Sequence, residues 1–198
     1  MQKTNEYLNQ LTYSVEHIIQ TVEEITRTYS AAQLAQRPVP ERWSVLDCLE
    51  HLSLYGDFYL PVFEKIIDKG IQQNKAPRQN FEPGWLGNFF VNSMKPKGSK
   101  IPNPMKTFKS KNPILTAVPE NVVERFFKQQ EQLLTLLKKA RRTDIQKLRI
   151  PTTLGRFPKI SLGDGFAFLI AHEERHLLQI QNILTELDLQ PKVQLKWS

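Results

Sequence analysis

The stretch SLGDGFAFLIAHEERHLLQIQNILTEL, residues 161–187, indicates most clearly which fold this chain adopts. Its apolar side chains recur at steps of three or four, so that Leu169, Ile180 and Ile183 share one face of a helix. His172 and His176 belong to the same stripe, one helical turn apart, with Cβ atoms about 6 Å from each other. The stretch therefore predicts a helix that buries two imidazoles side by side.

Three further segments show the same helical periodicity, and none shows a convincing alternating strand pattern. The second helix of the chain opens with Ser-x-x-Asp (Ser44, Asp47), which is typical of a capping box. It contains Pro61, where we expect a kink or a break. Four amphipathic helices of about twenty residues predict an all-α fold, a four-helix bundle, with residues 1–198 as one domain. The three segments are residues 5–29, 44–70 and 120–140.

Residues 71–118 form a long, proline-rich and basic connection between the second and third helices. They hold six of the thirteen prolines and eight basic residues against one acid, an excess equal to the formal net charge of +7. Nucleic-acid binding is one interpretation, but no recognition motif is present and a solvated lysine-rich loop is favoured. Because structureless loops of this length are unusual, we expect a functional or partly structured segment, with a short helix at 85–94. The basic residues are Lys75, Arg78, Lys95, Lys97, Lys100, Lys106, Lys109 and Lys111.

Composition and cysteine usage bear on the compartment. The longest uninterrupted apolar run, residues 166–171, is too short to cross a bilayer, and the first ten residues lack the apolar core of a signal peptide. The single cysteine, Cys48, excludes an intrachain disulfide and suits a reducing compartment. We therefore expect a cytoplasmic protein that does not associate with membranes.

The buried histidines point to a metal, although two of them alone leave the question open. A divalent ion bound through neutral imidazole nitrogens, at about 2.0–2.1 Å for zinc, would satisfy both His172 and His176. Two core histidines without a metal are an equally good interpretation of the pair. His51 favours the metal, because an antiparallel or crossing second helix could bring it opposite the pair. The fourth histidine, His17, has polar neighbours on its helix face and is expected at the surface.

The letters HEERH also fit H-E-x-x-H, the signature of zinc metalloproteases. One group of those enzymes has a glycine and a third ligand histidine at positions that are Gln179 and Asn182 here. Another group uses a glutamate on a later helix, but Glu186 lies on the same helix, about 15 Å further along. No strand is predicted before the motif to hold a peptide. We interpret the match as accidental.

Two motifs give the chain a resemblance to a known family. RPVPERWSVLDCLEHL (37–52) is similar to the Trp-Ser entry into the second helix of the DinB-like superfamily, which includes the YfiT-type metal-dependent hydrolases, with the ligand histidine seven residues after the serine. TLGRFPKISLGDGFAFLIAHEERHLLQI (153–180) resembles the Leu-Gly turn, the start of the fourth helix and the His-x3-His-x2-Gln-Ile ending of that family. Order and approximate spacing are preserved, and only the 71–118 connection departs from the family pattern.

The resemblance implies that His51, His172 and His176 bind one divalent metal ion, whether zinc, nickel, iron or copper. Three nitrogens on one side leave positions open for water or a substrate atom, as in catalytic sites. The resemblance further implies a small-molecule substrate and transfer of a low-molecular-weight thiol to an electrophile, with hydrolysis as the next choice. A non-catalytic, metal-binding stress-response protein is the alternative. A homodimer is an expectation from the family alone.

Five other side chains are weighed near these histidines, and none is identified as catalytic. Asp47 could orient the His51 ring as an outer partner of the metal, or it could only cap its helix. Gln179 could reach the pocket beside His176, or it could be a polar residue at the end of the bundle. Glu173 and Glu174 are interpreted as surface charge rather than a general base, and Cys48 as a small core residue rather than a nucleophile.

Overall fold

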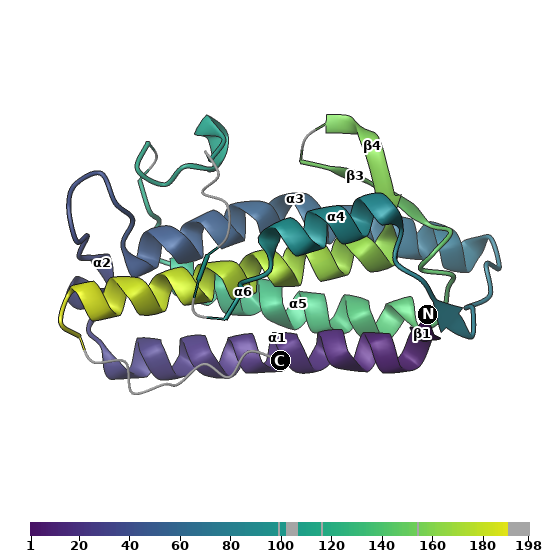
Figure 1. The fold of residues 1–198 in the computed structure, drawn as a ribbon, viewed down its shortest axis with the longest axis horizontal. Coiled ribbons are helices and arrows are strands. Elements are labelled where there is room, and N and C mark those ends of the chain that lie inside the picture. Colours follow the sequence, from purple (N-terminus) through teal and green to yellow (C-terminus); the bar gives the residue numbers. More distant parts are fainter. Residues whose placement is uncertain (99, 102–106, 116, 154, 190–198) are drawn as a thin grey trace.

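The computed structural model describes residues 1–98, 100–101, 107–115, 117–153 and 155–189, and four long helices lie side by side in it (Figure 1). This arrangement confirms the all-α bundle. For each of the four long helices, the first and last residues predicted from the sequence lie within two residues of the observed ones. Lys106 of the basic segment and Leu154 of the predicted Leu-Gly turn lie outside the described residues. The long helices are α1 (Thr4–Thr28), α3 (Val45–Gln72), α5 (Val122–Ala140) and α6 (Leu162–Glu186).

The directions of the helices explain why the second connection is so long. The N-terminal half of α3 meets the start of α5, where Arg125 donates to Glu50 at 3.0 Å, and Asp68 near the end of α3 pairs with Lys139 near the end of α5. The two helices are therefore parallel, and the chain must travel back along the bundle before α5 begins. With 19 residues, α5 alone is about 28 Å long, a distance that a short turn cannot cover.

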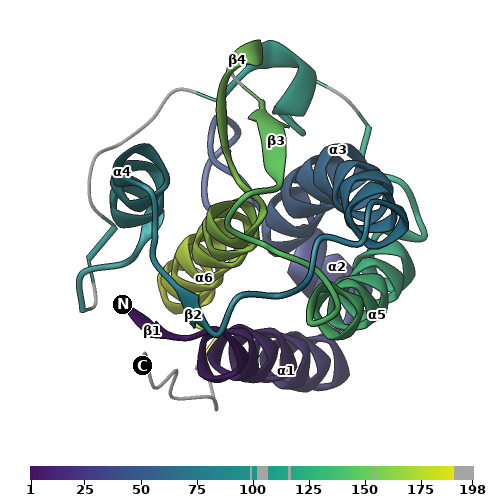
Figure 2. The same ribbon diagram turned by 90° about the vertical axis from the view of Figure 1, so that its right-hand side faces the viewer.

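Helix α6 runs antiparallel to α3 and forms the centre of the molecule (Figure 2). Phe166, near the start of α6, packs against Phe63 in the second half of α3, with ring centroids 4.5 Å apart. Further along α6, His172 meets His51 in the first half of α3. This antiparallel pairing brings the Trp-Ser motif and the HEERH motif to the same level of the bundle.

The connection between α3 and α5 is partly structured. Its short helix α4 (Trp85–Met94) has the bounds expected from the sequence, and a single 3-10 turn, η1 (Lys109–Lys111), follows. Helix α4 packs along α6, where the Asp164 carboxylate accepts hydrogen bonds from the Gly84 amide and the Ser161 hydroxyl. The segment is therefore a wall on the bundle as well as a connection. Before α4, β2 (Asn80–Phe81) pairs antiparallel with β1 (Gln2–Lys3) at the start of the chain.

A β-hairpin directly precedes α6, so the expectation that no strand stands before HEERH is wrong. Its strands are β3 (Arg149–Thr152) and β4 (Gly155–Ser161), paired antiparallel. Ile150 lies opposite Ile160 and both side chains are buried, whereas Phe157, Pro158 and Lys159 are exposed. So few inward-facing apolar residues give no clear alternation. The hairpin rises from the bundle beside α3 (Figure 1).

The sequence predicts a kink or a break at Pro61, and no break occurs there: helix α3 continues through Pro61 to Gln72. A proline within a helix removes one backbone hydrogen bond and frees a carbonyl four residues earlier. Pro61 is exposed, so water can solvate that carbonyl.

Before α3, the five-residue helix α2 (Ala31–Ala35) begins with a capping box at Ser30. In the described part of the chain, no helix is both long and apolar enough to cross a membrane.

Candidate metal centre

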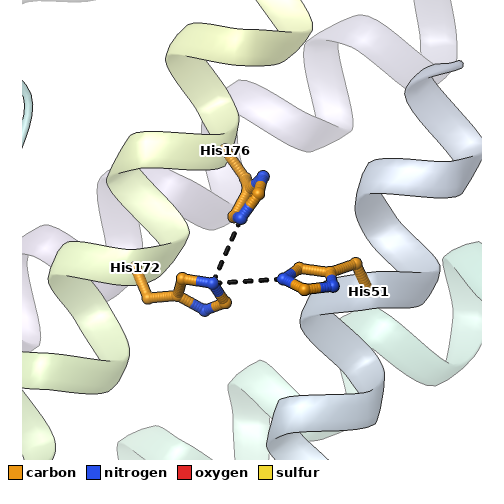
Figure 3. Close-up of side chains that lie close together, drawn as sticks. All are labelled: His51, His172 and His176. Atoms are coloured by element: carbon orange, nitrogen blue, oxygen red, sulfur yellow. Dashed lines mark hydrogen bonds between the residues drawn. The ribbon is translucent and has the colours of Figure 1, made fainter. Parts of the chain in front are cut away.

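Three histidines from two helices turn their rings toward one point (Figure 3). The Nε2 atom of His172 lies 3.2 Å from Nε2 of His51 and 3.1 Å from Nε2 of His176. One ring nitrogen from each residue falls within a group whose atoms all lie within 4.8 Å of one another. The side chains are buried, with exposed fractions between 3% and 7%. The structure thus brings together the three residues singled out from the sequence.

Hydrogen bonds on the far side of two rings fix which nitrogen carries the proton. His51 Nδ1 lies 2.7 Å from the backbone carbonyl of Lys111, and His176 Nδ1 lies 2.9 Å from the side-chain carbonyl oxygen of Gln179. Both oxygens can only accept, so both Nδ1 atoms donate. In the neutral rings, the Nε2 atoms of His51 and His176 then carry lone pairs, and both point toward His172.

This arrangement fits a cation better than it fits three free imidazoles. A neutral His172 ring has one N–H and can donate to only one of the two facing lone pairs. Its other nitrogen, Nδ1, is buried and has no hydrogen-bond partner among the described residues. Nitrogens bound tetrahedrally to zinc at about 2.0–2.1 Å would lie about 3.3 Å apart, close to the spacings observed. The donor set and its spacing therefore suit one divalent ion.

Burial also keeps the three rings neutral, which is the form that binds metals. Burial lowers the pKa of His51 to about 4, although the hydrogen bond to Lys111 acts in the opposite direction. Burial lowers the pKa of His172 and of His176 well below the usual value, and the charges of neighbouring basic groups lower them further. Neutral imidazole is the commonest protein ligand of metals.

A cavity of about 1030 Å³ adjoins the three rings. Helices α3, α4 and α6, the β3–β4 hairpin and the segment around η1 all contribute to its lining. Trp43, from the Trp-Ser motif, stacks on His176 with ring centroids 5.7 Å apart, and its Nε1 donates to Asn112 Oδ1 at 3.3 Å. A small molecule in this cavity would therefore lie directly beside the histidine nitrogens.

Lys111 belongs to this site although the sequence did not single it out. Its carbonyl holds the His51 ring, and its ammonium donates to the Leu54 carbonyl of α3 at 2.6 Å. The end of the basic connection is thereby fixed to α3 at two points. No sequence signal could have identified Lys111, because a backbone carbonyl is present in every residue and its place here depends on the path of the chain.

Among the described residues, the hydrogen bonds of Asp47 go to Arg37 and Ser44, and none to His51 is found. Its carboxylate accepts hydrogen bonds from Arg37 at 2.7 and 2.8 Å and from the Ser44 backbone amide at 2.8 Å. Burial would raise the pKa of Asp47, but the hydrogen bonds from Arg37 and Ser44 outweigh it and lower the pKa overall. The described contacts match the interpretation of Asp47 as a helix cap. Gln179, in contrast, lies beside the site against His176.

Replacing Asp47 by alanine is expected to destabilise the fold without removing bound metal. The change leaves Arg37 unpaired and removes half of the capping box, which should lower the free energy of unfolding by about 2–4 kcal/mol. Since the folded-state pKa is lowered, this stabilisation is present at neutral pH and is lost as the pH falls below about 4. Urea unfolding and elemental analysis of Asp47→Ala and wild type test both statements. An Asp47→Ala protein as stable as the wild type would contradict the first statement, and loss of metal from folded Asp47→Ala would contradict the second.

Glu173 is buried, so its interpretation as surface charge is wrong. Helix α6 is enclosed by neighbouring helices, and the Glu173 carboxylate accepts a hydrogen bond from Gln130 of α5 at 3.0 Å. Burial raises the pKa of Glu173 to about 8, so the side chain is mostly neutral at pH 7. Glu173 stands at the position of the catalytic base in H-E-x-x-H enzymes, but here its side chain is hydrogen-bonded to helix α5. This contact, together with a third histidine from an earlier helix, supports rejection of the protease interpretation.

Cys48 is buried on α3, and burial raises the pKa of its thiol well above the usual value. A thiol with a raised pKa forms little of the nucleophilic thiolate at neutral pH. This agrees with its interpretation as a core residue.

The fold is a helical bundle, and two of its facing helices bring three histidines to the wall of a cavity. These features place the protein in the class of helical bundles with a candidate metal site. A family model for the DinB superfamily matches residues 15–180, a range that includes all three histidines. The chain belongs to the DinB superfamily. No curated protein and no solved structure gives a match to the chain.

Proposed function

We propose that this protein is a metal-dependent enzyme that acts on a small molecule, with one divalent ion held by His51, His172 and His176. The observation that carries the proposal is the convergence of three Nε2 atoms at the wall of an open cavity. A structural metal site is usually closed by four protein ligands, whereas a catalytic site keeps a position for a reactant. In the described residues, no fourth histidine, cysteine or carboxylate joins the group.

Transfer of a thiol to an electrophile is the reaction we favour, with hydrolysis as the second choice. In thiol transfer the thiol loses its proton, its sulfur bonds to the electrophilic carbon, and the leaving group departs with the electron pair. An ion at the three histidines would supply Lewis acidity, which lowers the pKa of a thiol or a water molecule. The chain orients the histidine rings through hydrogen bonds from their Nδ1 atoms to Lys111 and Gln179.

Metal analysis together with a thiol assay tests the proposal. Tag-free wild-type protein should carry about one divalent ion per chain after incubation with zinc, nickel or iron and removal of excess. With that ion present, the protein should consume thiol when an alkyl or aryl electrophile is added, and chelation should stop the reaction. One ion per chain without thiol transfer or hydrolysis would favour the alternative, a non-catalytic metal-binding protein. No bound ion at all would overturn the site.

A further inference from the structure

Two chemically different kinds of side chain line the cavity beside the three histidines. Its apolar wall is formed by a continuous series of aromatic rings. Phe90 of α4 lies 6.3 Å from Phe168 of α6, measured between ring centroids, and Phe168 lies 5.8 Å from Tyr59 of α3. Tyr55 of α3 continues this series, and its ring centroid lies 4.3 Å from that of His172. A ligand could thus touch aromatic faces and the histidine nitrogens at the same time.

The aromatic wall is suited to a planar or branched apolar group. Tyr59 is fully buried, and the exposed fractions of Tyr55 and Phe168 are 8% and 7%. Such rigid rings bury a large area at little cost in conformational entropy, and they favour offset or edge contacts with another ring. A volume of about 1030 Å³ lies at the upper end of the range for small-molecule sites. The cavity therefore has room for an apolar body of two or more fused rings.

Two arginines also line the cavity. Arg175 lies one residue before His176 on α6, lines the same cavity and is 7% exposed. Arg42 lines it as well and pairs with Glu186 at 2.6 Å. Among the described lining residues the one acidic side chain is Glu41, which is exposed. An arginine guanidinium stays charged and carries five N–H donors, so Arg175 can bind an acidic group of a ligand in addition to its partners in the protein.

We propose that the cavity binds amphipathic organic anions, with an aromatic or other bulky apolar body against Phe90, Phe168 and Tyr55 and an acidic group beside Arg175. This inference rests on the proposed function, because it assigns the substrate class of the same site. It also gives the basic connection a role, since α4 supplies Phe90 and thereby one wall of the cavity. The rim stays accessible, as Phe89 and Phe108 line the cavity and are 63% and 46% exposed.

Calorimetric titration with three matched naphthalene probes tests the proposal. The probes are naphthalene-2-sulfonate, the neutral naphthalen-2-ylmethanol and the cationic naphthalen-2-ylmethylamine, which share one apolar body and differ in charge. Sulfonate is a poor metal ligand, so its binding reports the protein walls and not a bound ion. We expect one sulfonate probe per chain, bound at least about tenfold more tightly than the amine. Equal affinities for all three probes, or no binding, would overturn the proposal.

Variants locate the two ends of the ligand. Phe90→Ala should weaken all three probes by about three- to tenfold, while the exposed Phe157→Ala, outside the cavity lining, should change nothing. Arg175→Gln should abolish the preference for the sulfonate, and Arg175→Lys should retain part of it. Because Arg175 is largely buried, Arg175→Lys and Phe90→Ala keep the test decisive if the glutamine variant does not fold. Probe affinities that none of the cavity variants changes would place the ligand elsewhere.

Metal content measured on the same samples separates this inference from the proposed function. Probe binding by protein that takes up no metal even after incubation with zinc, nickel or iron would contradict the enzyme proposal and leave the ligand class standing. One metal per chain without probe binding would contradict the ligand class alone.

Discussion

Replacing His51 by glutamine is expected to reduce the bound metal from about one ion per chain to near zero. The glutamine side chain has a similar volume and can still contact Lys111, but it offers no imidazole nitrogen to an ion. Loss of an outer hydrogen-bonding partner typically weakens metal binding by about 10–100-fold, and loss of a ligand should weaken it more. Elemental analysis and titration with a chromophoric zinc competitor measure the change.

The fourth histidine provides the matched control. His17 lies on α1 and does not belong to the three-histidine group, so His17→Gln should bind metal like the wild type. His172→Gln and His176→Gln should behave like His51→Gln, because each removes one of the three converging nitrogens. Near-stoichiometric metal in a folded His51→Gln protein would show that the ion is held elsewhere. Circular dichroism should confirm that each variant retains its helices.

Replacing Gly87 by alanine is expected to lower the free energy of unfolding by about 1–3 kcal/mol, because α4 rests directly on α6 at this residue. A Cβ atom at Gly87 would lie 2.2 Å from Cγ and 2.4 Å from Cβ of Asp164. These atoms lie close to the α6 backbone and cannot move aside as the end of a long side chain can. Helix α4 must shift, which also weakens the hydrogen bond from the Gly84 amide to Asp164. Thermal unfolding measures the loss, at roughly 2–4 °C per kcal/mol.

The neighbouring position distinguishes this contact from a general effect on α4. Asn88 is exposed, and Asn88→Ala should leave the stability unchanged or raise it slightly, since alanine favours helices. Hydrogen exchange should show faster exchange in α4 of Gly87→Ala and unchanged exchange in α1. Metal content should be preserved, because the three histidines lie on α3 and α6. A Gly87→Ala protein as stable as the wild type would contradict the close packing of α4 on Asp164.

Local patterns determined the helices and the choice of histidines. A helix has a period of 3.6 residues, so the sequence itself records which face is buried, and capping residues such as Ser44 lie next to the ends that they mark. The same periodicity put His172 and His176 on one face of α6 before any packing was known. His51 could be recognised because it lies on the buried face of another helix and follows the Trp-Ser motif at the family spacing.

Contacts between distant residues were decided only by the tertiary structure. Pairing of Ile150 with Ile160 depends on a hairpin that sequence alternation does not reveal, and burial of Glu173 depends on α5 packing beside α6. The carbonyl that orients His51 comes from a residue 60 positions later in the chain. Helical periodicity reports only whether a residue faces the core, whereas its partner there depends on the direction of each helix and the path of the connections. The sequence by itself therefore determined the bundle and the three histidines, and packing determined the cavity, its aromatic wall and the groups that hold the rings.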